Sequence, residues 1–169
     1  GDRRIQVEMR TPCGWSPSCT ATRILFNLRE APRLRRGPYE WVVGFDLDGF
    51  HYGRAKTTPY IASIKGVIAD ELRNERGLVR AMLRIQAGLE GMAVTRADVV
   101  VATSRYSRDR IVEAYRIPAA KIVMVPELID LEAWGHDRHQ GSQPLGKPPA
   151  ILTVAHMFPR KNLGVLLRA

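Results

Sequence analysis

The sequence lacks long apolar runs. A helix that crosses a bilayer needs about 18 or more consecutive apolar residues, and no segment of the 169 residues approaches that length. The basic, apolar and small stretches of a signal peptide are also missing in that order, and the first residue is Gly1. The sequence therefore predicts neither a membrane-spanning helix nor a signal peptide, and we expect a cytoplasmic protein.

Cysteine is scarce, since Cys13 and Cys19 are the two in the chain. A structural metal site needs four ligands, and no second Cys or His pair lies close to these two in the sequence. A disulfide between them stays open as an alternative. Free thiols in a reducing compartment are the interpretation that we favour.

Acidic residues are outnumbered, with 17 Asp and Glu against 26 Lys and Arg, so the formal net charge is +9. A strong positive field favours anionic partners: nucleic acid, phosphorylated ligands or an acidic membrane surface. The arginines are scattered along the chain, so a solvated basic surface is an equal alternative. Where such a protein meets a membrane, we expect contact with anionic lipid at the inner face.

Short apolar segments bounded by turn residues recur along the chain and predict strands that are buried on both faces. A weaker alternating segment at residues 4–9 is also a candidate strand. The predicted strands cover residues 4–9, 41–45, 60–64, 98–102, 121–125 and 150–154.

Helical patterns lie between these strands, at residues 20–29, 77–96 and 108–116, with a last helix from Asn162. Ser107 is the predicted N-cap of the third of these helices. Along residues 76–96, five apolar side chains lie on one helix face and three arginines on another. The apolar ones are Leu78, Met82, Ile85, Leu89 and Met92, and the arginines are Arg76, Arg80 and Arg84.

Alternating strands and helices of this size predict an α/β fold, with a Rossmann-like parallel sheet and helices on both faces. Ligands of such sheets bind beyond the carboxyl ends of the strands. Residues 132–149 are rich in Gly and Pro and read as an interdomain linker. We therefore expect one domain over residues 1–131 and the start of a second over residues 150–169.

The segment that follows this linker combines a predicted strand, a short loop with the adjacent cations Arg160 and Lys161, and a helix start. Free N–H groups and the positive end of a helix dipole favour phosphate, and the two cations add charge-assisted contacts. A basic helix start on the surface, without a ligand, is the alternative.

This segment resembles the first strand, loop and helix of the donor-binding domain in retaining GT-B glycosyltransferases of family four. The resemblance implies that Lys161, with Arg160, holds the diphosphate of a nucleotide-sugar donor. His156 stands where the family has an arginine. Residues 96–107 and 121–130 resemble the end of the same family's acceptor-side domain, with Leu128 where the family usually has glycine.

Four residues at predicted strand ends are candidates for contacts with the acceptor or the sugar. Asp46 and Asp48 follow one strand, and Lys65 follows the next at a position where many family members have a histidine. Ser104 follows a third. Each has a structural alternative: the aspartates form a turn, Lys65 pairs with Asp70 or Glu71, and Ser104 caps a helix or turn.

The resemblance implies a GT-B N-terminal domain and the opening strand and helix of a second Rossmann-like domain. It implies transfer of a sugar, of the hexosyltransferase type, from a nucleoside-diphosphate sugar to a glycan, lipid-linked or small-molecule acceptor, with retention of configuration. No cofactor, metal or nucleic acid is expected. Both ends of the sequence look truncated, so we expect little activity from these residues alone. The alternative function is a non-catalytic anion- or nucleic-acid-binding α/β module.

Overall fold

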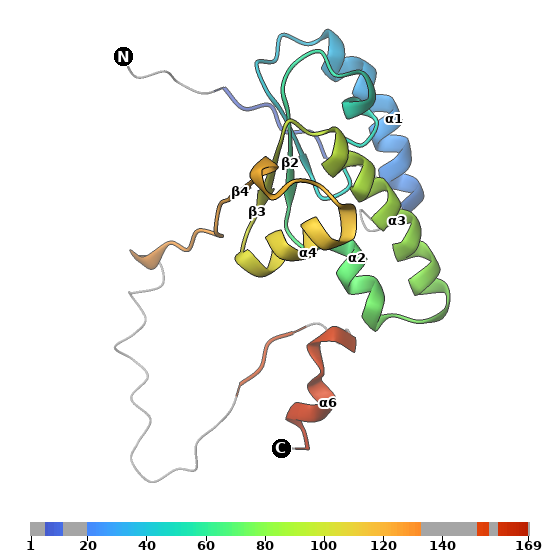
Figure 1. Ribbon diagram of the computed structural model, residues 1–169, viewed down its shortest axis with the longest axis vertical. Coiled ribbons are helices and arrows are strands. Elements are labelled where there is room, and N and C mark those ends of the chain that lie inside the picture. The colour runs from blue at the N-terminus through green and yellow to red at the C-terminus, as the bar shows by residue number, and fades with distance from the viewer. Residues whose placement is uncertain (1–5, 12–19, 133–151, 156–158, 169) are drawn as a thin grey trace. The chain divides into compact units, whose positions relative to one another are not determined.

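The computed structural model (Figure 1) describes residues 6–11, 20–132, 152–155 and 159–168. The chain divides into two compact units, Gly1–Val125 and Pro126–Ala169, which are described separately. Predictions for Cys13, Cys19 and His156, and for most of the linker, fall outside the described residues.

The first unit is built on a parallel sheet of four strands, which lie in the sheet in the order of the sequence. They are β1 (Val42–Phe45), β2 (Tyr60–Ile64), β3 (Val99–Ala102) and β4 (Ile122–Met124). Each agrees with a predicted strand to within a residue at either end. The fold class predicted from the sequence, a Rossmann-like α/β domain with a helix-flanked parallel sheet, is confirmed.

Helices precede and connect these strands. The α-helices of this unit are α1 (Thr20–Arg36), α2 (Ile68–Glu71), α3 (Gly77–Arg96) and α4 (Arg105–Tyr115), and its 3-10 turns are η1 (Tyr52–Ala55), η2 (Leu72–Asn74) and η3 (Ala119–Lys121). Figure 1 shows α1 and α3 alongside each other, and the Gln86 side chain of α3 donates a hydrogen bond to the Thr20 hydroxyl of α1. Among the described residues, no helix is long and apolar enough to cross a membrane.

The main core lies against the sheet face that carries Val42, Tyr60, Ala62 and Val100, all of which are buried. Residues of α1, α3 and α4 pack into the same cluster. Side chains of the opposite parity are more exposed, and Val43, Phe45 and Val123 keep about half of their surface in contact with solvent. The alternation of side chains along a strand explains this pattern.

Helix α1 extends well beyond the predicted residues 20–29, because it continues through Pro32 to Arg36. Proline lacks the N–H that would bond the carbonyl four residues earlier, and it usually ends or kinks a helix. Here Ala31 and Leu34 pack into the core on either side of Pro32, and their burial favours the continued helix. The sequence-based end of this helix was therefore wrong.

The apolar stripe predicted on α3 exists, but most of it faces solvent. Leu78 is 77% exposed and Ile85 is 56% exposed, and Met82 and Met92 are also exposed. The buried residues of α3 are Ala87, Glu90, Ala93 and Val94. An apolar helix stripe ordinarily packs against the core, so this arrangement is unusual.

The second unit contains the 3-10 turn η4 (Pro159–Lys161) and the short helix α6 (Leu163–Leu166). The helix expected from Asn162 is thus present, and Asn162 itself adopts a left-handed conformation with φ of 49°. The described residues 152–155 are not in a strand, contrary to the prediction for 150–154. Residues 6–9 are likewise not in a strand. In both places the apolar pattern was read as a strand, but a strand also needs a hydrogen-bonded neighbour.

Candidate functional site

The predicted residues Asp46 and Lys65 meet at the carboxyl ends of β1 and β2. The backbone N–H of Asp46 donates to the Ser63 carbonyl at 2.9 Å, and the Asp46 Oδ1 accepts the backbone N–H of Lys65 at 3.0 Å. Asp46 adopts a left-handed φ of 54°, a conformation that aspartate tolerates better than most residues. The turn thus places a partly exposed carboxylate beside the exposed Lys65, where ligands of parallel sheets bind.

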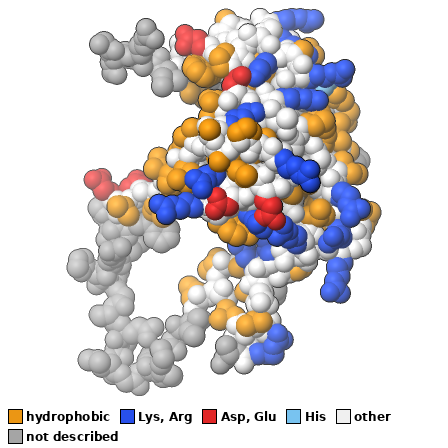
Figure 2. All heavy atoms as spheres, viewed as in Figure 1, with side chains coloured by type: hydrophobic (Ala, Val, Ile, Leu, Met, Phe, Trp, Pro, Cys, Tyr) orange, Lys and Arg blue, Asp and Glu red, His pale blue; other side chains and the backbone are white. Residues whose placement is uncertain are grey.

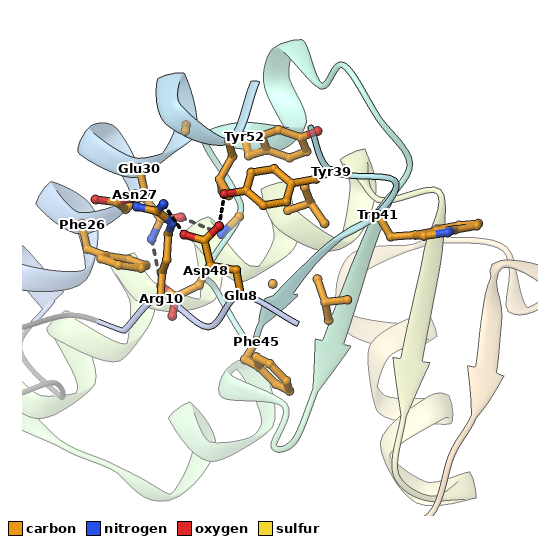
Figure 3. A pocket seen from close by; sticks show the side chains of 16 residues that line it. Glu8, Arg10, Phe26, Asn27, Glu30, Tyr39, Trp41, Phe45, Asp48 and Tyr52 are labelled. Carbon is orange, nitrogen blue, oxygen red and sulfur yellow. Dashed lines mark hydrogen bonds and ion pairs between the residues drawn. The ribbon is translucent and has the colours of Figure 1, made fainter. Parts of the chain in front are cut away.

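Asp48 is held by helix α1. Its carboxylate accepts hydrogen bonds from Arg23 Nη2 at 2.8 Å, Arg23 Nε at 3.3 Å and Asn27 Nδ2 at 2.8 Å. Asn27 Oδ1 also accepts the backbone N–H of Gly49 at 2.6 Å. Figure 3 shows Asn27 and Asp48 directed toward each other. These contacts lock the turn after β1 to α1, which corresponds to the structural alternative for Asp48.

Ser104 lies at the end of β3 and is the N-cap of α4. Its Oγ accepts the backbone N–H of Ser107 at 3.1 Å and lies 3.0 Å from the Ser107 hydroxyl. The prediction that Ser107 caps this helix was wrong, because the helix begins at Arg105, three residues before the predicted start. The capping alternative for Ser104 is thereby confirmed, and its hydroxyl is already committed within the protein.

The buried carboxyl of Glu90 binds the backbone of the loop that follows Lys65. Its Oε2 accepts the backbone N–H of Ile68 at 3.0 Å and a hydrogen bond from the Tyr115 hydroxyl. Its side chain is fully buried, and Oε1 has no hydrogen-bond partner. Burial raises the pKa of Glu90 to about 8; the two hydrogen bonds lower it, and the charges of Asp46 and Glu71 raise it further. Glu90 is therefore a neutral acid at pH 7.

The predicted diphosphate contacts lie in the second unit. Arg160 and Lys161 are exposed in the turn η4, directly before α6. His156 falls outside the described residues. The structure therefore joins Asp46 to Lys65 and gives Asp48 and Ser104 structural partners, whereas the donor contacts stay predictions.

A pocket lies on the other side of the Asp48 turn, between α1, β1 and the segment containing Glu8 and Arg10 (Figure 3). Its volume of about 140 Å³ is smaller than the several hundred Å³ typical of ligand pockets. Arg10 spans it to reach Glu30, with 3.0 Å between Nη1 and Oε2. We therefore place the candidate site at the strand ends and not in this pocket.

Sequence reasoning missed Arg23, Asn27 and Glu90. Arg23 and Asn27 are four residues apart on a helix, and this spacing places both on one face. That spacing could have suggested that the two side chains share a partner, but it does not identify the partner as Asp48. Glu90 gave a weaker signal, because it is the sole acidic residue within the 20 residues of α3.

The described residues contain no group of three or more His, Cys, Asp or Glu side chains that could hold a metal ion. Among curated proteins, none matches this chain. A family model described as Glycosyltransferase Family 4 matches residues 4–133, which is most of the chain and includes every strand of the sheet. Such a domain implies a sugar donor and an acceptor as substrates. The chain belongs to Glycosyltransferase Family 4, and its function is of the glycosyltransferase type.

Proposed function

We propose that the protein transfers a sugar, of the hexosyltransferase type, from a nucleoside-diphosphate sugar to an acceptor hydroxyl with retention of configuration. The observation that supports this most directly is the junction of Asp46 and Lys65 at the carboxyl edge of the sheet. It combines a hydrogen-bond acceptor with a cation in a domain of a sugar-transferring family. The acceptor is a glycan, a lipid-linked sugar or a small molecule.

Asp46 is the residue of the first unit that we assign to the acceptor. One of its carboxylate oxygens binds the Lys65 backbone, while no hydrogen bond to the other is found among the described residues. A carboxylate oxygen accepts a hydroxyl hydrogen bond well. Lys65 follows beside Asp46, and its positive charge would attract an anionic or hydroxyl group of the acceptor or the donor. We keep Asp48 and Ser104 as supports of this edge and not as direct contacts.

Lys161 and Arg160 are assigned to the donor, with His156 as a third candidate. As the glycosidic bond breaks, negative charge grows on the leaving diphosphate, and cations placed there stabilise that charge. No metal is part of this proposal, so the cationic side chains take over that role. The proposal also includes contact with anionic lipid at the inner face of the membrane. The net charge of +9 favours such contact.

The donor assignment is tested by calorimetric binding of uridine, guanosine and adenosine diphosphate sugars to the protein. Replacing Lys161 with glutamine removes a charge-assisted bond of about 1.5–3 kcal/mol, which corresponds to roughly 10- to 100-fold weaker donor binding. Arg168→Gln is the matched control, since it removes an exposed cation from the same unit. Equal affinity of Lys161→Gln and the wild type, or no binding of any donor, would contradict the proposal.

The acceptor assignment is tested by Asp46→Asn, which keeps an oxygen for the Lys65 N–H but removes the charge. We expect an unchanged unfolding temperature and a lower kcat/KM for the acceptor. Nuclear magnetic resonance of the product's anomeric centre then reports retention or inversion. Inversion would refute the stereochemical part alone.

A further inference from the structure

The short loop between β2 and α2, residues 65–67, is bound by a carboxyl group at each end. At its entry, the Asp46 Oδ1 accepts the backbone N–H of Lys65 at 3.0 Å. At its exit, the Glu90 Oε2 accepts the backbone N–H of Ile68 at 3.0 Å. Because each residue of a free loop has many backbone conformations, two fixed ends remove much of the freedom of so short a segment.

Glu90 takes the place of a capping side chain for α2. The N-cap residue of α2, Val67, makes no side-chain hydrogen bond to the helix, and the first N–H groups of a helix need an acceptor outside its regular bonding. The N–H groups of Asp70 and Glu71 bond the Val67 carbonyl, whereas the N–H of Ile68 bonds Glu90. A side chain of α3 therefore fixes where the loop ends and α2 begins.

Helix α4 orients the Glu90 carboxyl. The Tyr115 hydroxyl donates a hydrogen bond to Oε2, and the Tyr115 ring lies against Gly91, where an added Cβ would be 3.0 Å from the ring's Cδ1. The glycine therefore lets the ring approach α3 closely, beside Glu90. Helix α2 packs against both α3 and α4, as Figure 1 shows. Three helices thus meet at one fully buried carboxyl group.

The fixed loop carries an exposed cation, since Lys65 is exposed while Val67 and Ile68 are buried. Positive charge alone does not select a binding place, because Lys and Arg side chains are spread over the face of the molecule that Figure 2 shows. A cation on a fixed loop binds a ligand without a loss of backbone freedom, and this raises its affinity above that of a mobile one. The groups that fix the loop therefore contribute to binding at Lys65 without touching the ligand.

We propose that Glu90 is a positioning residue for sugar transfer, which holds residues 65–67 in the conformation that presents Lys65 and Asp46 to the substrate. The inference rests on the proposed function, to which the substrate contacts of Lys65 and Asp46 belong. An apolar side chain would serve packing alone better, because a buried carboxyl loses its water and leaves Oε1 without a partner. What the carboxyl provides and an apolar group does not is an acceptor for the Ile68 N–H.

Three variants test this role at about pH 6.5, where Glu90 keeps its proton because burial raises its pKa to about 8. Glu90→Gln has the shape of the neutral acid and keeps an oxygen for the Ile68 N–H. Glu90→Leu has a similar volume but no acceptor. Tyr115→Phe keeps the ring and removes the hydroxyl that orients Oε2. Ile122→Val is the matched control, since it trims a buried side chain at the start of β4, which β3 separates from β2.

Hydrogen exchange followed by nuclear magnetic resonance measures how firmly the loop is held, and it needs no donor. The amides of β3 report opening of the whole unit, so the rate at Ile68 is compared with theirs. On this scale the Ile68 amide should exchange roughly tenfold faster in Glu90→Leu, the effect of one lost hydrogen bond, and by a smaller factor in Tyr115→Phe. It should keep the wild-type rate in Glu90→Gln and in Ile122→Val.

Transfer kinetics show whether the held loop serves the reaction. The probes are uridine, guanosine and adenosine diphosphate glucose as donors, with p-nitrophenyl glucoside and p-nitrophenyl mannoside as acceptors. We expect Glu90→Leu to raise the acceptor KM roughly tenfold with a smaller change in kcat, because a released loop must be ordered again when the substrate binds. Glu90→Gln should restore the wild-type KM, and Ile122→Val should leave both constants unchanged.

Several results would overturn the inference. One is a wild-type exchange rate of the Ile68 amide in Glu90→Leu. Another is faster exchange in Glu90→Leu with an acceptor KM that moves no more than in Ile122→Val. Equal losses in Glu90→Leu and Glu90→Gln would also contradict it, because the acceptor oxygen would then not matter. A wild type that transfers none of these sugars would count against the proposed function instead, and the exchange rates alone would then decide whether Glu90 holds the loop.

Discussion

Glu90 should make the stability of the sheet-containing unit fall as the pH rises toward 8. This residue of α3 has a fully buried carboxyl, which contacts the start of α2 and Tyr115 of α4. Burial raises the pKa of Glu90 to about 8 in the folded protein, from the ordinary value of 4.5. Oε2 already accepts two hydrogen bonds, so the proton of the neutral acid belongs on Oε1, which has no partner.

The sign of the effect follows from the numbers of protons bound. Between pH 4.5 and about 8 the unfolded chain has lost the Glu90 proton while the folded protein keeps it. The unfolded state therefore binds fewer protons, and the free energy of unfolding falls across this window. At 1.36 kcal/mol for each pKa unit, the whole loss is about 5 kcal/mol.

Glu90→Gln removes this dependence, because an amide does not titrate in the window. Its carbonyl oxygen keeps the bonds from Ile68 and Tyr115, but its N–H groups take the position of the unpartnered Oε1. An unsatisfied buried donor costs about 1–3 kcal/mol at every pH. The informative quantity is therefore the change with pH in the stability difference between variant and wild type, and not that difference at any one pH.

Urea unfolding, followed by circular dichroism from about pH 5 to about pH 8, measures this quantity. We expect the stability of Glu90→Gln relative to the wild type to rise by about 3.5 kcal/mol over that range. Glu40→Gln, at an exposed position with no hydrogen bond or ion pair among the described residues, should parallel the wild type. If Glu90→Gln also parallels the wild type, Glu90 is ionised in the folded protein and the reasoning fails.

Two further predictions concern the supports of the candidate site. Ser104→Ala should lower the free energy of unfolding by about 1 kcal/mol, the usual value of an N-cap. Ser107→Ala should lower it by less, because the Ser104 hydroxyl caps the helix by accepting the backbone N–H of Ser107, which this variant keeps. Equal losses in urea titrations would contradict the assignment of Ser104 as the N-cap. Gly44→Ala should cost about 2–4 kcal/mol, because a Cβ there would lie 2.1 Å from the Asp48 carbonyl oxygen; a wild-type unfolding temperature would show that the turn adjusts freely.

The strands could be predicted from the sequence because each is a short apolar run that ends at a turn residue. Residues 60–64 form β2 as predicted. The same criterion failed for residues 6–9 and 152–155, which have apolar residues but are not in strands. Strand formation depends on a neighbouring strand as well as on composition, and the local sequence does not contain that information.

Helix α3 shows a different limit of periodicity. A stripe that repeats every three to four residues identifies a helix and its faces, and the bounds Gly77–Arg96 agree with the prediction. Periodicity does not show which face of the helix packs inward when apolar residues lie on both faces. Ala87 and Ala93 pack there because they are small, and Glu90 is tolerated because Tyr115 and Ile68 bind its carboxyl.

Asp46 and Asp48 follow the same strand, yet their environments assign them different tasks. Asp48 is bound on both oxygens by α1, so an added ligand would have to displace a partly buried ion pair. Asp46 uses one oxygen to fix the Lys65 backbone and leaves its charge at the carboxyl edge. Because a fixed, partly solvated carboxylate binds a ligand without first losing a partner, Asp46 is the better candidate for substrate contact. Asp48, through its bonds to α1, makes the turn after β1 rigid, and this rigidity keeps Asp46 at the carboxyl edge of the sheet.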